Sequence, residues 1–252
     1  MRILVIDDYL NVEIGLRAIL DGHTVTGVRN PGDLGKMLAH EEPFDQAIVD
    51  LRYARSAATG LTALATLREL APRTATIIST TEEEENRLLY LLAAFQFFTP
   101  KALLAKSADA FVTRAVVEAI GRGEPSPSAA ADPFRKAATM SPPVLDQVVH
   151  NRTELSIWQE LARFDKRQEI ASAAHVHPRT LDAFTASKGA AIDVVHAQFP
   201  QQEDPRPEAP AGGSAGTHGS NLIRVIHFAR IHAQFFGDAE VAGLLAAHWR
   251  GP

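Results

Sequence analysis

The feature that most constrains the fold of this chain is a short apolar run that ends on a carboxylate, Ala47-Ile48-Val49-Asp50. Consecutive apolar residues suit a strand that is buried on both faces, as strands are in a parallel α/β sheet. Asp50 would then emerge at the carboxyl edge of that sheet. Because ligands bind at this edge in open α/β sheets, we expect a functional site around Asp50.

Three further apolar runs deliver polar side chains to the same edge of the predicted sheet. These runs are Ile3–Ile6, Thr76–Ile78 and Phe97–Pro100. The residues that follow them are, in chain order, Asp7 and Asp8, then Ser79 with Thr80 and Thr81, and finally Lys101. Three carboxylates, a hydroxyl and an ammonium at the ends of four predicted strands form a specific set, although any single aspartate could merely end a strand or cap a helix.

This set of side chains has a chemical use. Close carboxylates repel one another, and a hard divalent cation with oxygen ligands relieves the repulsion, with Mg²⁺ usual where phosphate is also bound. Asp50 could then attack a phosphoryl group and form an aspartyl phosphate. Lys101 and one of the hydroxyls would hold the phosphoryl oxygens.

Helical patterns alternate with the predicted strands. A further strand is expected at Thr24–Val28, and helices are expected at 12–20, 33–38, 61–70, 82–92 and 108–120. The acidic run Glu82 to Glu85 suits the start of its helix, because negative charge is favoured at a helix N-terminus. Alternating strands and helices predict a doubly wound, flavodoxin-like α/β domain over residues 1–123.

The carboxylates, hydroxyls and lysine together resemble the receiver domains of two-component response regulators. The resemblance implies that Asp50 is the phosphoacceptor, that Asp7, Asp8 and Asp50 bind Mg²⁺ together with the carbonyl of Arg52, and that Ser79 and Lys101 act on the phosphoryl group. Thr80 and Thr81 remain alternatives to Ser79. The loop Leu51–Gly60 departs from the family, since it lacks the usual Met-Pro step and is longer.

Composition limits the class of protein. The chain has 252 residues and no cysteine, so disulfides and thiolate chemistry are excluded. No stretch resembles a signal peptide or is apolar over the length of a bilayer, so we expect a cytoplasmic protein without a membrane partner. Residues 125–199 carry 8 basic and 8 acidic side chains, which is not the strongly basic balance of a dedicated DNA binder.

A second domain is predicted after a linker at residues 124–140, which is rich in Pro, Ser and Ala and contains a possible short helix. Within the all-α domain expected at 141–199, two short helices joined by a tight turn are typical of a helix-turn-helix. The segment 153–192 resembles LuxR/NarL-type output domains, best at Glu169–Ala171 and Pro178–Leu181. The resemblance implies that the residues facing DNA are Lys166, Arg167, Arg179, Thr180 and Lys188. Asp182 departs from the family, which usually places a polar or basic residue there.

The C-terminal part divides into two stretches. Residues 200–220 are rich in Pro, Gly, Glu and Ala without apolar periodicity, and we expect a disordered linker. Residues 221–252 carry the pattern of amphipathic helices, which must bury their apolar faces. They could pack on the output domain or on a second copy of the chain.

Together these features predict a response regulator that a sensor histidine kinase phosphorylates on Asp50 and that acts as a homodimer on DNA. The alternative is a regulator whose helical output binds a protein partner. A stand-alone hydrolase on a phosphatase-like fold is a third class. It would need an acid-base carboxylate just after the nucleophile, where Leu51 and Arg52 stand, so we expect no enzyme of this kind.

Overall fold

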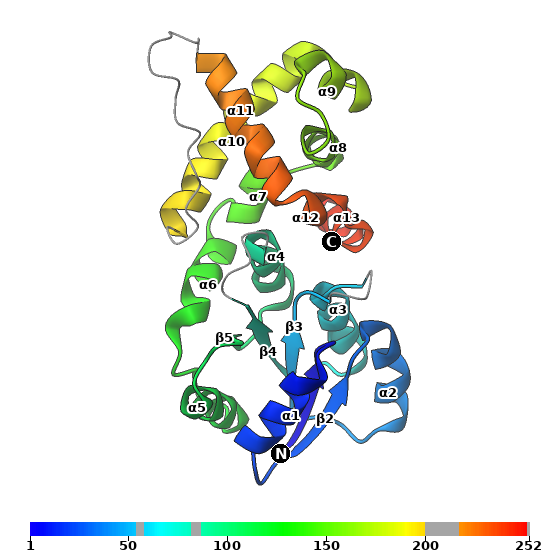
Figure 1. Cartoon of the computed structure of the whole chain (residues 1–252), viewed down its shortest axis with the longest axis vertical. Helices are drawn as coiled ribbons and strands as arrows, with labels where there is room; N and C mark the ends of the chain where they lie inside the picture. Colours follow the sequence, from blue (N-terminus) through cyan, green and yellow to red (C-terminus); the bar gives the residue numbers. More distant parts are fainter. Residues whose placement is uncertain (54–57, 82–86, 200–216, 251–252) are drawn as a thin grey trace. The chain divides into compact units, whose positions relative to one another are not determined.

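The computed structural model describes residues 1–53, 58–81, 87–199 and 217–250, with no side-chain description for 217–220. The chain separates into two compact units (Figure 1). The first comprises Met1–Glu84 and Tyr90–Lys136, and the second comprises Glu85–Leu89 and Ala137–Pro252.

The first unit is built on a five-stranded parallel sheet in the order β2-β1-β3-β4-β5. This order, with β3 in the centre, is that of a doubly wound flavodoxin-like fold. The strands are β1 (Arg2–Ile6), β2 (Thr24–Val28), β3 (Gln46–Asp50), β4 (Ala75–Thr80) and β5 (Ala102–Ala105). The predicted fold class is therefore confirmed.

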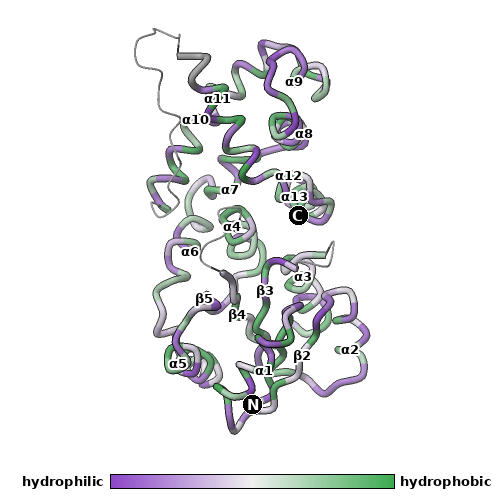
Figure 2. The backbone as a smooth tube through the Cα atoms, viewed as in Figure 1, coloured by the Kyte–Doolittle hydropathy of each residue, from purple (hydrophilic) through white to green (hydrophobic). Residues whose placement is uncertain are grey.

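Helices cover both faces of the sheet. They are α1 (Leu10–Ile19), α2 (Leu34–His40), α3 (Gly60–Leu70), α4 (Arg87–Phe98) and α5 (Ala110–Gly121), with a short 3-10 helix η1 (Pro31–Asp33) before α2. Ile3 and Val5 pack into one core cluster with residues of α1 and α5, while Leu4 and Ile6, which alternate with them, are also fully buried. Because successive strand residues point to opposite faces, β1 is covered on both sides, as its apolar sequence predicts. In Figure 2, β3 and α4 are coloured mostly as hydrophobic.

One strand lies later in the sequence than we expected. Phe97 and Phe98 were predicted to lead into Lys101 as a strand, but they form the last turn of α4. The fifth strand is Ala102–Ala105, after Lys101. The prediction was wrong because a short apolar run fits either a strand or a buried helix, and this run continues a helix in which every residue from Leu88 to Phe95 is buried.

The stretch predicted as a linker, residues 124–140, contains regular structure. A 3-10 helix, η2 (Ala129–Ala131), leads directly into α6 (Asp132–Thr139). Phe134 of α6 stacks on Phe95 of α4 with 5.5 Å between ring centroids, and Arg135 donates to the backbone carbonyl of Lys101 just before β5. The start of α6 therefore packs on the α4 and β5 side of the first unit.

The second unit is helical. Its elements are α7 (Val144–Val148), α8 (Arg152–Leu161), α9 (Arg167–Ala173), α10 (Pro178–Gln198), α11 (Thr217–Ile231), α12 (Ala233–Gly237) and α13 (Ala239–Trp249). Its core surrounds Trp158, which is fully buried and whose indole nitrogen donates to the Val148 carbonyl at 2.9 Å. The Trp158 ring lies 5.1 Å from Phe184, 5.4 Å from Phe228 and 4.9 Å from Phe236, measured between centroids.

These contacts decide where the C-terminal helices pack. Phe228 belongs to α11 and Phe236 to α12, and both reach the tryptophan of α8. Of the two possibilities left open by the sequence, packing on the output helices is the one observed within this chain. Most of the predicted disordered linker 200–220 lies outside the described residues. Among the helices that the structure describes, none is long and apolar enough to cross a bilayer.

Candidate functional site

Three aspartates meet at the carboxyl edge of the sheet. Asp7 follows the last residue of β1, Asp8 comes next, and Asp50 is the last residue of β3. Because β1 and β3 are neighbours in register, their ends lie side by side. Each aspartate offers an oxygen that lies within 4.8 Å of the other two. Asp7 and Asp50 are both only 5% exposed and Asp8 is half-buried, so most of the cluster is shielded from water despite its position at an edge.

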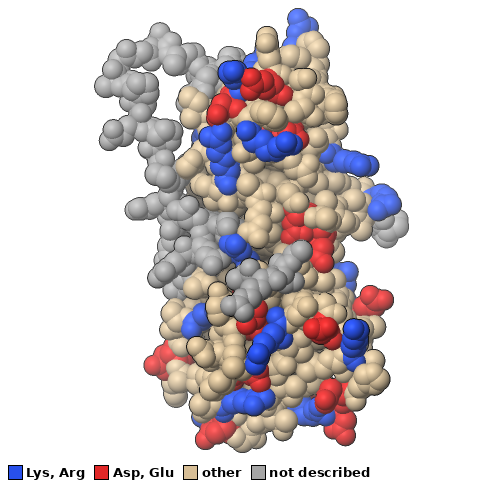
Figure 3. Space-filling view, turned by 45° about the vertical axis from the view of Figure 1, so that its right-hand side comes forward, with Lys and Arg blue, Asp and Glu red and all other residues tan. Residues whose placement is uncertain are grey.

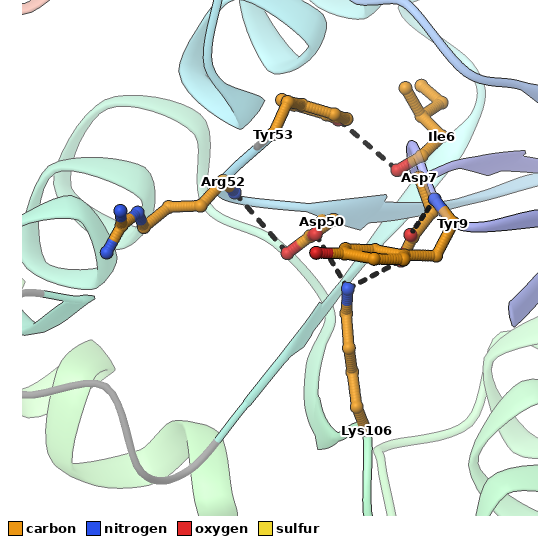
Figure 4. A network of polar contacts seen from close by, with 7 residues as sticks. All are labelled: Ile6, Asp7, Tyr9, Asp50, Arg52, Tyr53 and Lys106. Carbon is orange, nitrogen blue, oxygen red and sulfur yellow. Dashed lines mark hydrogen bonds and ion pairs between the residues drawn. The ribbon is translucent and has the colours of Figure 1, made fainter. Parts of the chain in front are cut away.

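Lys106 joins two of these carboxylates. Its ammonium lies 2.7 Å from Oδ2 of Asp7 and 2.7 Å from Oδ2 of Asp50 (Figure 4). Lys106 directly follows β5, which places it at the same carboxyl edge as the aspartates. The Lys106 side chain is 17% exposed, so this is a largely desolvated ionic contact in which one ammonium pairs with two carboxylates.

Lys101, which we expected to serve in this position, does not reach the cluster. It precedes β5, at the opposite end of the strand from Lys106, and its side chain is exposed. Its backbone N–H donates to the Thr76 carbonyl at 2.7 Å. The sequence held a signal that would have identified Lys106: the run Ala102-Leu103-Leu104-Ala105 ends on a lysine just as Ala47-Ile48-Val49 ends on Asp50.

Burial and pairing shift the pKa values of this pair. Burial raises the pKa of Asp50 to about 6, and the attraction of Lys106 offsets only part of that increase. Burial alone would lower the pKa of Lys106, but Asp50 and Asp7 outweigh it and the pKa is raised. At neutral pH the site therefore holds an ionised Asp50 beside a firmly protonated lysine.

Backbone groups orient the two buried carboxylates. The N–H of Tyr9 donates to Oδ1 of Asp7 at 2.9 Å, and the N–H of Arg52 donates to Oδ1 of Asp50 at 3.3 Å. Gly60 at the start of α3 touches the backbone of Asp50. A Cβ on residue 60 would lie 2.2 Å from the Asp50 carbonyl oxygen, so only glycine allows this approach.

Two tyrosines that the sequence analysis did not single out also belong to the site. Tyr53 is 6% exposed, and its hydroxyl donates to the carbonyl of Ile6 at 3.2 Å, which ties the segment after β3 to the end of β1. The ring centroid of Tyr9 lies 5.6 Å from the Lys106 ammonium. Figure 4 shows the Tyr9 ring beside Asp50 and the Lys106 ammonium, and the Tyr53 ring directed toward Ile6. No periodicity or spacing marks these two residues in advance.

The predicted hydroxyl residues lie on the neighbouring strand. Ser79 pairs in register with Asp50, and Thr80 is the last residue of β4. Ser79 and Thr80 are 8% and 5% exposed. Thr81 follows the strand. All three stand beside the edge that carries Asp50, and the role of Ser79 stays a prediction.

The second candidate site is the helix-turn-helix formed by α9 and α10. Lys166 is the N-cap of α9 and pairs with Glu169 at 3.1 Å. Arg167 forms two hydrogen bonds to the carboxylate of Asp182 on α10. Arg179 and Thr180 are exposed in the first turn of α10. On the face of the second unit visible in Figure 3, basic side chains lie next to acidic ones.

Lys188, which we expected to face DNA, is buried and only 5% exposed. Its ammonium lies 2.7 Å from the Glu154 carboxylate and 2.8 Å from the Gln147 carbonyl. The residue therefore links α10 to α8 and α7 inside the unit. The expectation was wrong because the face of α10 that carries Lys188 is turned to the core by Leu181 and Phe184, which are also buried.

Comparison with known proteins bears on the fold. No protein-family model matches this chain, and no curated protein sequence matches it. The two-component response regulator RcsB in its DNA complex superposes with a TM-score of 0.55 at 15% identity, over 89% of this chain and 98% of that one. An RcsB chain from a structure of two RcsB dimers bound to two parallel DNAs superposes with a TM-score of 0.53 at 17% identity, over 77% of this chain and 91% of the RcsB chain.

A shorter match is the response regulator DrrB of Thermotoga maritima, an OmpR/PhoB homologue, with a TM-score of 0.40 at 20% identity. This match covers 49% of the chain and spans about half, 54%, of DrrB. At these identities the comparisons show the fold. The chain thus has the fold of response regulators that combine a receiver domain with a helix-turn-helix output, as the resemblance implied.

Proposed function

We propose that this chain is a response regulator whose Asp50 accepts a phosphoryl group from a sensor histidine kinase. The observation that carries this proposal is the bridge from Lys106 to Asp7 and Asp50 at the carboxyl edge of the sheet. A carboxylate nucleophile, two further carboxylates and an ammonium beside them suit the formation of an aspartyl phosphate. In this proposal Lys106 takes the role that the sequence analysis gave to Lys101.

The chemistry follows from the charges in the pocket. A carboxylate oxygen of Asp50 attacks phosphorus, the bond from phosphorus to the donor breaks, and the electron pair of that bond leaves with the donor. Three phosphoryl oxygens then crowd a pocket that already holds Asp7 and Asp8. Lys106 can exchange its contact with Asp50 for one with a phosphoryl oxygen, because the Asp50 carboxylate loses its negative charge when the acyl phosphate forms.

The acidic cluster fits a divalent cation, since Asp7, Asp8 and Asp50 each present an oxygen within 4.8 Å of the others. These residues would hold Mg²⁺, with the Arg52 carbonyl as the further ligand that the family supplies. When bound there, Mg²⁺ would supply charge neutralisation for the transferring phosphoryl group. The three carboxylates would hold the ion. The hydrogen bond from the Tyr53 hydroxyl to the Ile6 carbonyl keeps the segment after β3 close to the aspartates.

The direct test is the mass of the intact protein after incubation with acetyl phosphate and Mg²⁺. We expect one added phosphoryl group in the wild type and none in Asp50→Asn. Lys106→Met should slow the uptake about tenfold or more, because a charge that faces the phosphoryl group is lost. Lys101→Met is the matched control, and it should phosphorylate at the wild-type rate because its side chain lies at the other end of β5.

Two results would contradict the proposal. Uptake that persists in Asp50→Asn would mean that another residue accepts the group. Equal rates in Lys106→Met and wild type, with a slow Lys101→Met, would return the phosphate-binding role to Lys101.

For the output we propose a cytoplasmic transcription regulator that binds DNA as a homodimer through α10. This proposal is supported by the match in fold to RcsB, which was solved bound to DNA and as dimers. Arg179 and Thr180 are exposed in the first turn of α10, where a recognition helix contacts base edges and phosphates. Phosphorylation would act by favouring the pairing of two outputs on adjacent half-sites.

A second candidate, a protein-binding output, is favoured by the charges of the helix-turn-helix. Arg167 is held by Asp182, Lys166 is paired with Glu169, and Lys188 is buried. Three of the five expected DNA contacts are thus engaged inside the chain. A surface neutralised in this way would gain less DNA-binding affinity from phosphate contacts than a basic surface would.

A titration of phosphorylated protein on labelled genomic fragments at several salt concentrations separates the two candidates. DNA binding predicts an affinity that falls steeply with salt, and Arg179→Ala should lower that slope by about one. Arg163→Ala, in the turn after α8, is the control, because it also removes an exposed arginine that pairs only with its neighbour Glu160 among the ion pairs described. Binding that is weak and independent of Arg179 would favour the protein partner.

A further inference from the structure

Tyr9 stands between the buried ion pair and solvent. Tyr9 as a whole residue is 56% exposed, while the side chains beneath it are far less exposed, with 17% for the Lys106 side chain alone, 6% for that of Asp50 and 3% for that of Asp7. The ring lies within cation-π distance of the Lys106 ammonium. In Figure 4 the ring extends from the end of β1 across the space in front of the ion pair.

Helix geometry does not explain a tyrosine at this position. Tyr9 is the N-cap residue of α1, where Ser, Thr, Asp and Asn are preferred because their side chains accept a hydrogen bond from the first turn. The Tyr9 side chain makes no capping hydrogen bond. The backbone instead directs the ring toward Lys106, through the extended conformation of the residue and the N–H bond to Asp7.

We infer that the Tyr9 ring shields Lys106 and the phosphoryl group on Asp50 from water, and so prolongs the life of the aspartyl phosphate. The inference rests on the proposed function. It makes Tyr9 a residue that sets how long the signal lasts, without taking part in the transfer itself.

The reaction that Tyr9 opposes is hydrolysis of the acyl phosphate. A water oxygen bonds to phosphorus, the bond from phosphorus to the Asp50 oxygen breaks, and its electron pair returns to the carboxylate. The water gives up its proton to solvent, and inorganic phosphate leaves. A ring that stays against Lys106 keeps the ammonium on the phosphoryl oxygens and reduces the space that an attacking water needs.

The first test is the decay of the isolated phosphoprotein, followed by intact mass. We expect Tyr9→Ala to shorten the half-life about two- to fivefold, the factor that corresponds to loss of an exposed cation-π contact. Tyr9→Phe keeps the ring and should decay as the wild type does. Leu10→Ala removes the neighbouring exposed side chain, which is 43% exposed, and should also leave the half-life unchanged.

The second test needs no phosphorylation. An amine-acylating reagent is applied to the unmodified protein, and the labelling of Lys106 is measured relative to exposed Lys101 in the same molecule. Tyr9→Ala should raise this ratio about two- to fivefold, while Tyr9→Phe and Leu10→Ala leave it at the wild-type value.

The outcomes separate the inference from the proposed function. An unchanged labelling ratio in Tyr9→Ala would overturn the shielding of Lys106. A raised labelling ratio with an unchanged half-life would overturn the inference that Tyr9 prolongs the life of the aspartyl phosphate. If no protein takes up a phosphoryl group, the proposed function fails, and the labelling ratio still decides whether Tyr9 covers Lys106.

Discussion

Asp50 and Lys106 show burial and pairing acting on the same groups in opposite directions. Burial removes water from both side chains and disfavours both charges. The lysine has two carboxylates beside it, at 2.7 Å each, so attraction prevails and its pKa rises. Asp50 shares its one cation with Asp7, so burial prevails and its pKa also rises. The pocket therefore holds a carboxylate that is more basic than usual, which favours a nucleophile.

The first prediction concerns the ionisation of Asp50. Its pKa is raised from 3.8 to about 6, so between these values the folded protein retains a proton that the unfolded chain has lost. The free energy of unfolding should therefore decrease as pH rises through this window, by roughly 3 kcal/mol at about 1.4 kcal/mol per pKa unit. Above pH about 6 Asp50 is ionised in the folded protein as well, so its ionisation lowers the free energy of unfolding no further.

Carbon-detected NMR of the aspartate carboxyl groups in the metal-free protein measures the effect directly. One resonance should titrate near pH 6 and be absent from Asp50→Asn, which also lacks the decrease in stability. A carboxyl that titrates near 3.8 would mean that the pairing with Lys106 fully offsets the effect of burial. Because the carboxylate is the nucleophile, we also expect phosphorylation to slow as pH falls below about 6.

At the scale of elements, α4 and α6 explain why the fifth strand was misplaced. The α4 helix is apolar around its whole circumference, and the side chains from Leu88 to Phe95 are almost entirely buried. A helix of this kind has no polar face to reveal its period, so its last residues, Phe97 and Phe98, resemble a short strand. The stacking of Phe134 on Phe95 brings α6 onto this helix.

The second prediction is that α6 stabilises the α4 and β5 side of the first unit. Phe134→Ala should cost about 3–5 kcal/mol, because the residue is only 8% exposed and removal of its ring leaves a cavity. Amide hydrogen exchange should accelerate in peptides from α4 and β5 more than in peptides from β1. Phe111→Ala is the control, since this residue on α5 is 79% exposed and its loss should change stability by about 0.5 kcal/mol at most. Equal protection of the α4 and β5 amides from exchange in wild type and Phe134→Ala would show that α6 does not stabilise these elements.

For the molecule as a whole, the C-terminal helices complete the second unit. Phe228, Phe235 and Phe236 are buried, and two of them contact Trp158. Ion pairs connect the same parts of the chain, with Arg230 bound to Asp165 and Arg224 to Asp193 at 2.6 Å each. The helices after residue 217 are therefore part of the output core and not an appendage.

The third prediction tests this packing. Phe236→Ala should destabilise the second unit by about 3–5 kcal/mol, because a fully buried ring stacked on Trp158 is lost. In a Trp249→Phe background the remaining tryptophan, Trp158, should emit at longer wavelength as water reaches it. Ile223→Ala on α11, where the side chain is 57% exposed, should leave both the emission and the unfolding transition unchanged. An unshifted emission in Phe236→Ala would mean that α12 does not cover Trp158.

The sequence by itself determined the doubly wound fold, four of its five strands and the meeting of Asp7, Asp8 and Asp50. These follow from local patterns, because an apolar run sets the strand and the next residue must lie at its end. Tertiary structure decided the rest. Tyr53 donates to the Ile6 carbonyl across 47 positions, Tyr9 lies on Lys106, and Lys188 turns inward to Glu154. Such contacts depend on which faces pack together. Which faces pack together depends on the burial of many side chains at once, and this packing produces no periodic pattern or fixed spacing in the sequence.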